Sequence, residues 1–122
     1  MGDGAVATKK AVDLLKAGDI GAFNRWIKER RKKGKGGVDL DDKDLSGLGL
    51  READLREAHL NGANLRKSDL RGADLHGARL RQADLRGSDL RETDLSDADL
   101  RKAKLKGANL KDAKLKGARG LD

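Results

Sequence analysis

The residues that could carry chemistry in this chain are two histidines, His59 and His76, a few hydroxyl groups and many charged side chains. The chain has no cysteine, so neither a thiolate metal site nor a disulfide can form. A serine nucleophile would need a hydroxyl, an imidazole and a carboxylate in contact, and a metal would need several ligands at one point. Whether such groups meet depends on the elements that position them.

The overall composition is unusual for a folded domain. Charged residues make up 40% of the 122 residues, aromatic residues only 2%, and the formal net charge is +7. Composition alone would place the chain close to disordered proteins. The N-terminus shows no secretory signal, and no segment is long enough to cross a membrane. Together with the absence of cysteine, these features predict a cytoplasmic protein with no membrane partner.

A strict repeat of leucine overrides that compositional impression. Leucine occupies every fifth position from Leu40 to Leu115, which gives sixteen units of small residue, polar residue, leucine and two free positions. Leucines five apart would spiral round a straight helix, and on a single long strand they would alternate between faces. The chain must therefore bend within each unit, so that all the leucines point at one axis. This pattern predicts a solenoid.

The units at 53–57, 63–67, 73–77 and 108–112 follow the pattern Ala-(Asp/Asn)-Leu-x-x, which resembles the pentapeptide-repeat proteins. The resemblance implies an all-β solenoid, namely a right-handed quadrilateral β-helix in which four units form one coil. Leucine and the small residue would face inward, and residues twenty apart would stack. Sixteen units would then give about four coils, which we assign to a domain at residues 38–122. The resemblance implies no general active site and no cofactor.

The segment 1–37 is predicted to be an N-terminal helical cap followed by a basic connector. Residues 1–7 are expected to be flexible, Thr8 to cap a short helix that ends before Gly18, and Asp19 to cap a second helix. The pair would cover the first coil, because an open end would leave leucines and unpaired strand edges in water. An alternative use of the same apolar stripe is a partner-binding groove. The predicted core of the cap is Leu14, Leu15, Ile20, Phe23, Trp26 and Ile27.

Departures from the repeat predict local features. Ser68 and Ser88 take the inward small position twenty residues apart, so their hydroxyls are expected to bond to each other or to the backbone. Glycine in the last position of seven units predicts corners with positive φ. Under the four-unit rule His59 and His76 lie on different faces, so neither a shared metal nor a Ser-His-Asp geometry is expected. We predict no catalytic, metal-binding or cofactor-binding residue.

The outward residues predict one basic face, around Leu45, Leu65, Leu85 and Leu105. Its cations outnumber Asp44 and Asp84 to give a net charge of +3. On the next face an arginine row is offset by acidic residues, which indicates interleaved ion pairs. The final coil, 98–117, carries a net charge of +5. The candidate binding surface combines the basic face with this lysine-rich end: Arg66, Lys67, Arg86, Lys104, Lys106, Lys111, Lys114 and Lys116.

The register breaks after the last unit, because Gly120 stands where a seventeenth leucine would fall. We therefore expect the last coil to be open and to self-associate, as a homodimer through this coil, or to meet an unseen partner. The leucines expected there are Leu100, Leu105, Leu110 and Leu115.

These features favour a non-enzymatic scaffold that mediates protein-protein interaction in a bacterial cytoplasm. Two alternatives stay open. The basic face and the lysine-rich end could bind a nucleic-acid backbone, although the repeats contain no aromatic residue for base stacking. Some pentapeptide-repeat proteins mimic DNA toward type II topoisomerases, but a net charge of +7 disfavours that role here.

Overall fold

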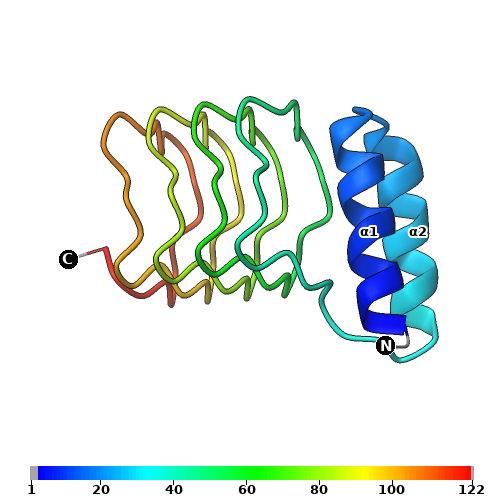
Figure 1. Ribbon diagram of the computed structural model, residues 1–122. Helices are drawn as coiled ribbons and strands as arrows, with labels where there is room; N and C mark the ends of the chain where they lie inside the picture. The colour runs from blue at the N-terminus through cyan, green and yellow to red at the C-terminus, as the bar shows by residue number, and fades with distance from the viewer. Residues whose placement is uncertain (1–2, 122) are drawn as a thin grey trace.

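The structure, a computed structural model, describes residues 3–121 and consists of a helical cap on one end of a stack of four-sided coils. The cap is made of α1 (Asp3–Lys16) and α2 (Ile20–Lys32), which lie side by side across the end of the stack (Figure 1). The coils then run away from the cap toward the C-terminus. No helix within residues 3–121 is both long enough and apolar enough to cross a membrane.

The start of α1 differs from the prediction. The helix begins at Asp3, so residues 3–7 are helical rather than a flexible start, and residues 1–2 lie outside the described part. Ala7 is buried and continues the inward face of α1, which explains the earlier start. Thr8 is not an N-cap, because it lies inside the helix and its hydroxyl donates to the Asp39 carbonyl at 2.7 Å. The N-cap predicted at Asp19 is confirmed, since its carboxylate accepts from the Ala22 N–H at 3.1 Å.

The coil of four units that the family resemblance implied is confirmed. Every bridge in the stack is parallel and joins residues twenty positions apart, from Asp39–His59 to Asp99–Arg119. Beyond the first coil, each bridge residue makes both of its backbone hydrogen bonds, through its N–H and through its carbonyl, to the coil before it. Asp74, for example, donates to Ala53 O at 3.0 Å and accepts from Leu55 N at 2.8 Å. Four units therefore make one coil.

The description of the fold as all-β needs a correction, because the described chain contains isolated bridges and no strand of consecutive paired residues. The reason is that a corner follows each bridge. The last residue of every unit has positive φ, including seven glycines such as Gly87 (69°) and nine other residues such as Lys67 (56°). The residue after this position usually donates to the carbonyl of the unit's leucine, as Ala53 does to Leu50 at 3.1 Å. This is the pattern of a type II turn.

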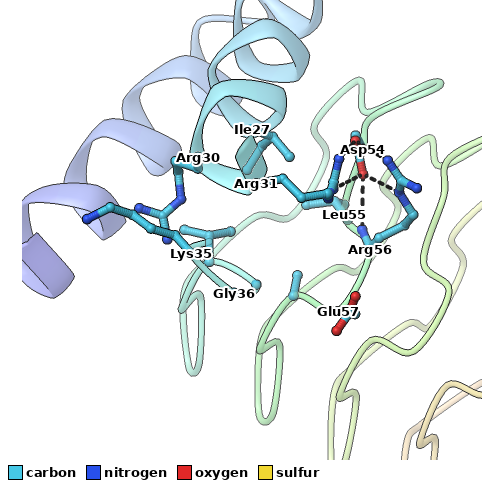
Figure 2. Close-up of a pocket in the computed structure, with 12 residues that line it drawn as sticks. Ile27, Arg30, Arg31, Lys35, Gly36, Asp54, Leu55, Arg56 and Glu57 are labelled. Carbon is cyan, nitrogen blue, oxygen red and sulfur yellow. Dashed lines mark hydrogen bonds and ion pairs between the residues drawn. The ribbon is translucent and has the colours of Figure 1, made fainter. Parts of the chain in front are cut away.

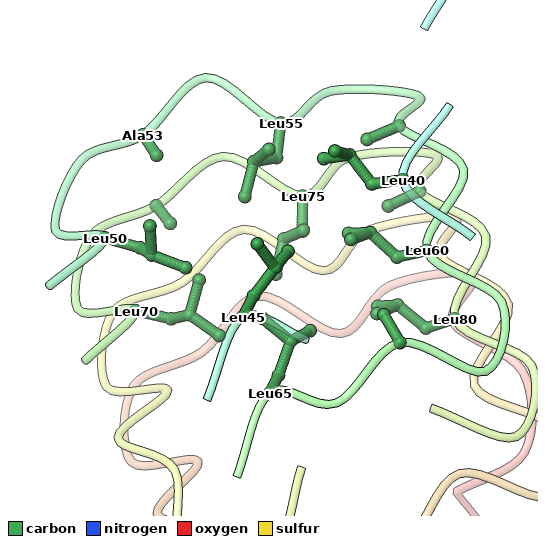
Figure 3. Close-up of a cluster of buried hydrophobic side chains, with 14 of the residues drawn as sticks. Leu40, Leu45, Leu50, Ala53, Leu55, Leu60, Leu65, Leu70, Leu75 and Leu80 are labelled. Carbon is green, nitrogen blue, oxygen red and sulfur yellow. The ribbon is translucent and has the colours of Figure 1, made fainter. Parts of the chain in front are cut away.

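The interior of the stack is a column of leucines. From Leu40 to Leu100 every repeat leucine is at most 1% exposed. Figure 3 shows those from Leu40 to Leu80 pointing inward from the sides of successive coils. The buried hydroxyls of Ser68 and Ser88 donate to Leu65 O and Leu85 O, each at 2.7 Å. Of the two bonding modes expected for these serines, the structure shows the bond to the backbone.

The cap shares one hydrophobic core with the stack. Leu15 and Phe23 are fully buried and Ile27 is 7% exposed, while Leu14, Ile20 and Trp26 pack against the same core and are partly buried. Trp26 is tilted against Phe23 with ring centroids 6.1 Å apart, and the Arg30 guanidinium lies 5.2 Å from the Trp26 ring. The aromatic residues of the cap therefore close the first coil.

The far end is better covered than expected. Leu100 is fully buried, so the prediction that it lines an exposed coil is wrong. Its N–H donates to Arg119 O at 2.8 Å, and Gly120 packs so closely that a Cβ there would lie 2.6 Å from Leu100 O. Leu105 and Leu110 are partly buried, and Leu115 is 37% exposed.

Candidate interaction surface

A histidine, a serine and an aspartate meet on one face of the stack, which the sequence analysis did not foresee. His76 Nδ1 lies 2.8 Å from Ser96 Oγ, which in turn donates to Asp94 Oδ1 at 2.6 Å. His76 and Ser96 are twenty residues apart, so the coil period could have revealed the contact. In a catalytic triad the imidazole takes the hydroxyl proton and the carboxylate holds the imidazole. Here the Ser96 hydroxyl donates its hydrogen bond to the carboxylate and not to the imidazole, so the arrangement is not that of a triad.

The other histidine, His59, bridges Asp39 and Arg79 in the backbone ladder and lies away from His76. Within residues 3–121 no group of three or more histidine and acidic side chains could hold a metal ion. The hollow between α2 and the first coil is also small, about 50 Å³. In Figure 2 Arg31 and Arg56 both point at Asp54, and they hold its carboxylate at 3.1 and 3.2 Å. This hollow is a joint between cap and stack, too small for an organic ligand.

The main polar feature of the stack is an arrangement that we call the Asp-Leu-Arg clamp. One carboxylate oxygen of the aspartate accepts from the backbone N–H and from Nε of the arginine two residues later, and the other oxygen accepts from Nη2. In Asp89–Arg91 the two side-chain bonds measure 2.9 and 2.6 Å. The clamp occurs five times, at 54–56, 69–71, 84–86, 89–91 and 99–101.

The clamp keeps its carboxylates ionised. The hydrogen bonds from Arg86 and Arg91 lower the pKa of Asp84 and of Asp89 from 3.8 to about 2. Those from Arg101 hold the pKa of Asp99 even further below its usual range. Charge-assisted, bidentate bonds of this kind favour the charged form of the acid. The negative charge of these five aspartates is therefore compensated directly by a neighbouring arginine.

The basic face retains free charge in spite of this pairing. Arg86 is held by Asp84 at 2.6 Å, and Arg66 lies 3.9 Å from the same carboxylate. Lys67, Lys104 and Lys106 are exposed and form no ion pair within the described residues. The coil period places Arg66, Arg86 and Lys106 in one row along this face.

The structure does not join all the candidate residues into one surface. Arg66, Lys67, Arg86, Lys104 and Lys106 share the basic face, whereas Lys111 lies on the next face and Lys114 and Lys116 on the one after that. All three of these terminal lysines are exposed. They ring the last coil rather than extend the basic face.

The interleaved ion pairs predicted for the face next to the basic one are confirmed for two of its cations, Arg71 and Arg91. Arg71 lies 2.8 Å from Asp69 in its own coil and 3.5 Å from Asp89 in the next coil. Arg91 then pairs with Asp89 at 2.6 Å. The other two cations of this row, Arg51 and Lys111, are exposed and form no ion pair within residues 3–121.

Comparison with known proteins agrees with this geometry. A family model described as pentapeptide repeats matches in 8 copies, over residues 50–87 and 78–117. The solved structure of a pentapeptide repeat protein from the Arabidopsis thaliana thylakoid lumen is 38% identical, with a TM-score of 0.61, over 66% of this chain and 59% of that one. HetL, a pentapeptide repeat protein involved in heterocyst differentiation regulation from the cyanobacterium Nostoc sp. strain PCC 7120, is 44% identical, with a TM-score of 0.67.

The match to HetL covers 70% of this chain and 40% of HetL, so the chain spans less than two thirds of the length of either relative. A search of the curated proteins finds no match. The family model alone covers more than half of the chain, and it coincides with the coils described above. The chain therefore belongs to the pentapeptide-repeat family and has its fold, a right-handed quadrilateral β-helix, here preceded by two helices.

Proposed function

We propose that the chain is a non-enzymatic scaffold in a bacterial cytoplasm and that its basic face binds a protein partner. The observation that carries the proposal is the row of cations on that face, where Lys67, Lys104 and Lys106 are exposed and free of ion pairs within residues 3–121. The leucine core beneath holds the backbone of these residues at regular positions. A rigid surface loses little conformational entropy when a partner binds.

Backbone binding to nucleic acid is the alternative use of the same cations and of the terminal lysines. Phe23 and Trp26 are the only aromatic residues and both lie in the cap, so the coils offer no ring on which a base could stack. Binding through phosphates alone would weaken steeply with salt. A mobility shift of duplex DNA at low salt that disappears near physiological salt would support this alternative over a protein partner.

Mimicry of DNA toward a type II topoisomerase is disfavoured by the clamps as well as by the net charge of +7. A DNA mimic needs a continuous acidic surface, but clamped carboxylates such as Asp84 and Asp99 face a guanidinium at 2.6 and 2.7 Å. Inhibition of gyrase supercoiling at micromolar protein would instead favour DNA mimicry over the other two functions.

Self-association through the last coil is a separate proposal. Leu115 is exposed there and Leu105 and Leu110 are only partly covered, which gives a second copy an apolar contact. The surrounding lysines oppose it, because two copies end to end would bring like charges together. Light scattering that shows a monomer at high concentration would remove the homodimer.

The direct test of the basic face is a charge reversal with a matched control. Lys104→Glu with Lys106→Glu changes the face but breaks no ion pair, and Arg25→Glu with Lys28→Glu makes the same change of charge on α2. Proteins from the source cells that bind the unaltered chain are expected to be lost with the first variant and kept with the second. Equal loss with both variants would indicate non-specific attraction and would count against the proposal.

A further inference from the structure

Three units have arginine after the leucine but no aspartate before it, with Gly49, Asn64 or Arg79 in that position, and only the third has a second cation there. In Arg79-Leu80-Arg81 the first position holds arginine where five other units hold aspartate. Arg81 therefore has the position of a clamp arginine without the carboxylate that such an arginine binds. Its backbone N–H is satisfied by Asn61 Oδ1 at 2.9 Å, one coil closer to the cap, whereas its guanidinium has no partner within residues 3–121.

The neighbouring acids do not supply that partner. Asp99, which stacks on Arg79 in the next coil, is held by its own clamp with Arg101 at 2.7 Å and by Arg119 at 3.4 Å. Within residues 3–121 neither Arg79 nor Arg81 forms an ion pair. Two adjacent guanidinium groups on one face thus remain uncompensated.

These guanidinium groups border a surface hollow of about 330 Å³. Its remaining polar lining comes from Asn61, Asp97, Asp99 and Arg119. The hollow has the size to accept a side chain, and it lies on a different face from the basic face.

We propose that this hollow receives an aspartate or glutamate from an acidic segment of a partner protein, which completes the Asp-Leu-Arg clamp of Arg81 in trans. The chain itself shows five times what an arginine in this position binds: a carboxylate held by Nε and Nη2. Arg79 would add a second positive charge beside the bound acid. Arginine is the residue best suited to such a planar, bidentate contact.

A carboxylate suits the hollow better than a phosphate group. Asp97 and Asp99 line the same hollow, so an incoming anion meets negative as well as positive charge. A phosphate group carries nearly two charges at neutral pH, whereas a side-chain carboxylate carries one. The inference rests on the proposed function, in that the outside of the stack binds protein, but it uses a different face and can fail independently.

The test is Arg79→Asp, which places the missing carboxylate within the chain and occupies Arg81. The variant should fold normally, with a urea midpoint equal to or above that of the parent, because it adds a sixth clamp. Binding of a fluorescein-labelled peptide of alternating Asp and Gly should weaken by about tenfold or more. Arg25→Asp, with the same change of charge on α2, should leave binding nearly unchanged, and so should Lys104→Glu with Lys106→Glu.

Several results would overturn the inference. They are no binding of the peptide to the parent chain, equal binding to Arg79→Asp, or equal weakening by Arg25→Asp. Displacement of the peptide by inorganic phosphate but not by acetate would assign the hollow to phosphate. A dimer that becomes a monomer on Arg79→Asp would make the acidic segment that of a second copy. If only the Lys104 and Lys106 variant loses the cellular partner, the proposed function stands without this site.

Discussion

Asn24 of the cap forms two hydrogen bonds with the edge of the first coil: Oδ1 accepts from the Asp54 N–H at 2.8 Å, and Nδ2 donates to Glu52 O at 3.0 Å. In the next coil the equivalent N–H, that of Asp74, donates to Ala53 O. The first coil has no coil before it, so a side-chain amide replaces the missing backbone. Thr8 does the same for the Asp39 carbonyl.

Asn24→Ala is expected to destabilise the chain by about 1–3 kcal/mol, because the Asp54 N–H then loses its acceptor at a partly buried site. Urea unfolding followed by Trp26 fluorescence and by circular dichroism measures the change. Asn109→Ala is the control, since the hydrogen bond that the Asn109 side chain accepts from Lys111 N is exposed. A cost no larger than that of the control would show that the edge contact is unimportant.

The leucine column predicts a steep dependence of stability on position. Leu65→Ala removes a fully buried side chain from the middle of the stack and should cost about 2–5 kcal/mol. Leu115→Ala alters a leucine that is 37% exposed and should cost clearly less. Urea midpoints of the two variants compare them directly. Equal losses would mean that the last coil is covered in solution, as a homodimer would cover it.

At the corners, replacing glycine by alanine should lower stability, whereas replacing another residue by glycine should not. Gly107 has a φ of 76°, and a Cβ there would come no closer than 3.6 Å to another atom, so Gly107→Ala tests the backbone alone. We expect a loss of about 1 kcal/mol, the order of the cost of a left-handed conformation for an L-residue. Lys102→Gly, at a φ of 63°, should not destabilise. Thermal unfolding of both variants checks the sign.

The clamps predict a loss of stability in acid. The pKa of Asp84 and of Asp89 is about 2 in the folded chain and 3.8 ordinarily, so the folded state binds protons less readily than the unfolded one. Their contribution is therefore complete above about pH 4 and is lost as the pH falls through about 2. The urea midpoint should therefore fall as the pH is lowered from about 4 to about 2.

The control for this acid effect is Asp84→Asn with Asp89→Asn. Asparagine can still accept from the backbone, as Asn64 does from Arg66 N at 3.1 Å, but it does not titrate. This variant should lose less of its remaining stability between about pH 4 and pH 2 than the parent. An unchanged slope would indicate that other carboxylates govern the acid transition.

The leucine period predicts the solenoid almost completely, because few backbones bring every fifth residue to one axis. The four-sided section came from the family resemblance and is confirmed by bridges twenty residues apart. The prediction of Thr8 as an N-cap is wrong because threonine near the start of a helix is typical of that position. Its actual partner, Asp39 O, is far away in the sequence. Leu100 was misjudged because the packing of Gly120 depends on the path of the last residues.

The candidate surface was harder to predict than the fold. Counting charges along each face treated Arg86 and Lys106 as equal, although Arg86 is bound by Asp84 and Lys106 is free of ion pairs within residues 3–121. The Asp-Leu-Arg spacing was visible in the sequence, but its meaning depends on side-chain geometry that a count of faces does not contain. The exception at Arg79 becomes visible only against that spacing.

The four-unit coil also determines how insertions would alter the molecule. One unit added between Arg86 and Lys106 would leave every later leucine in the core but move each later outward residue by a quarter turn. Lys106 would then leave the row of Arg66 and Arg86. Adding four units lengthens the stack and restores the original alignment. Changes in the number of repeats can therefore rearrange the outer pattern of charge abruptly, while the packing of the hydrophobic interior stays nearly the same.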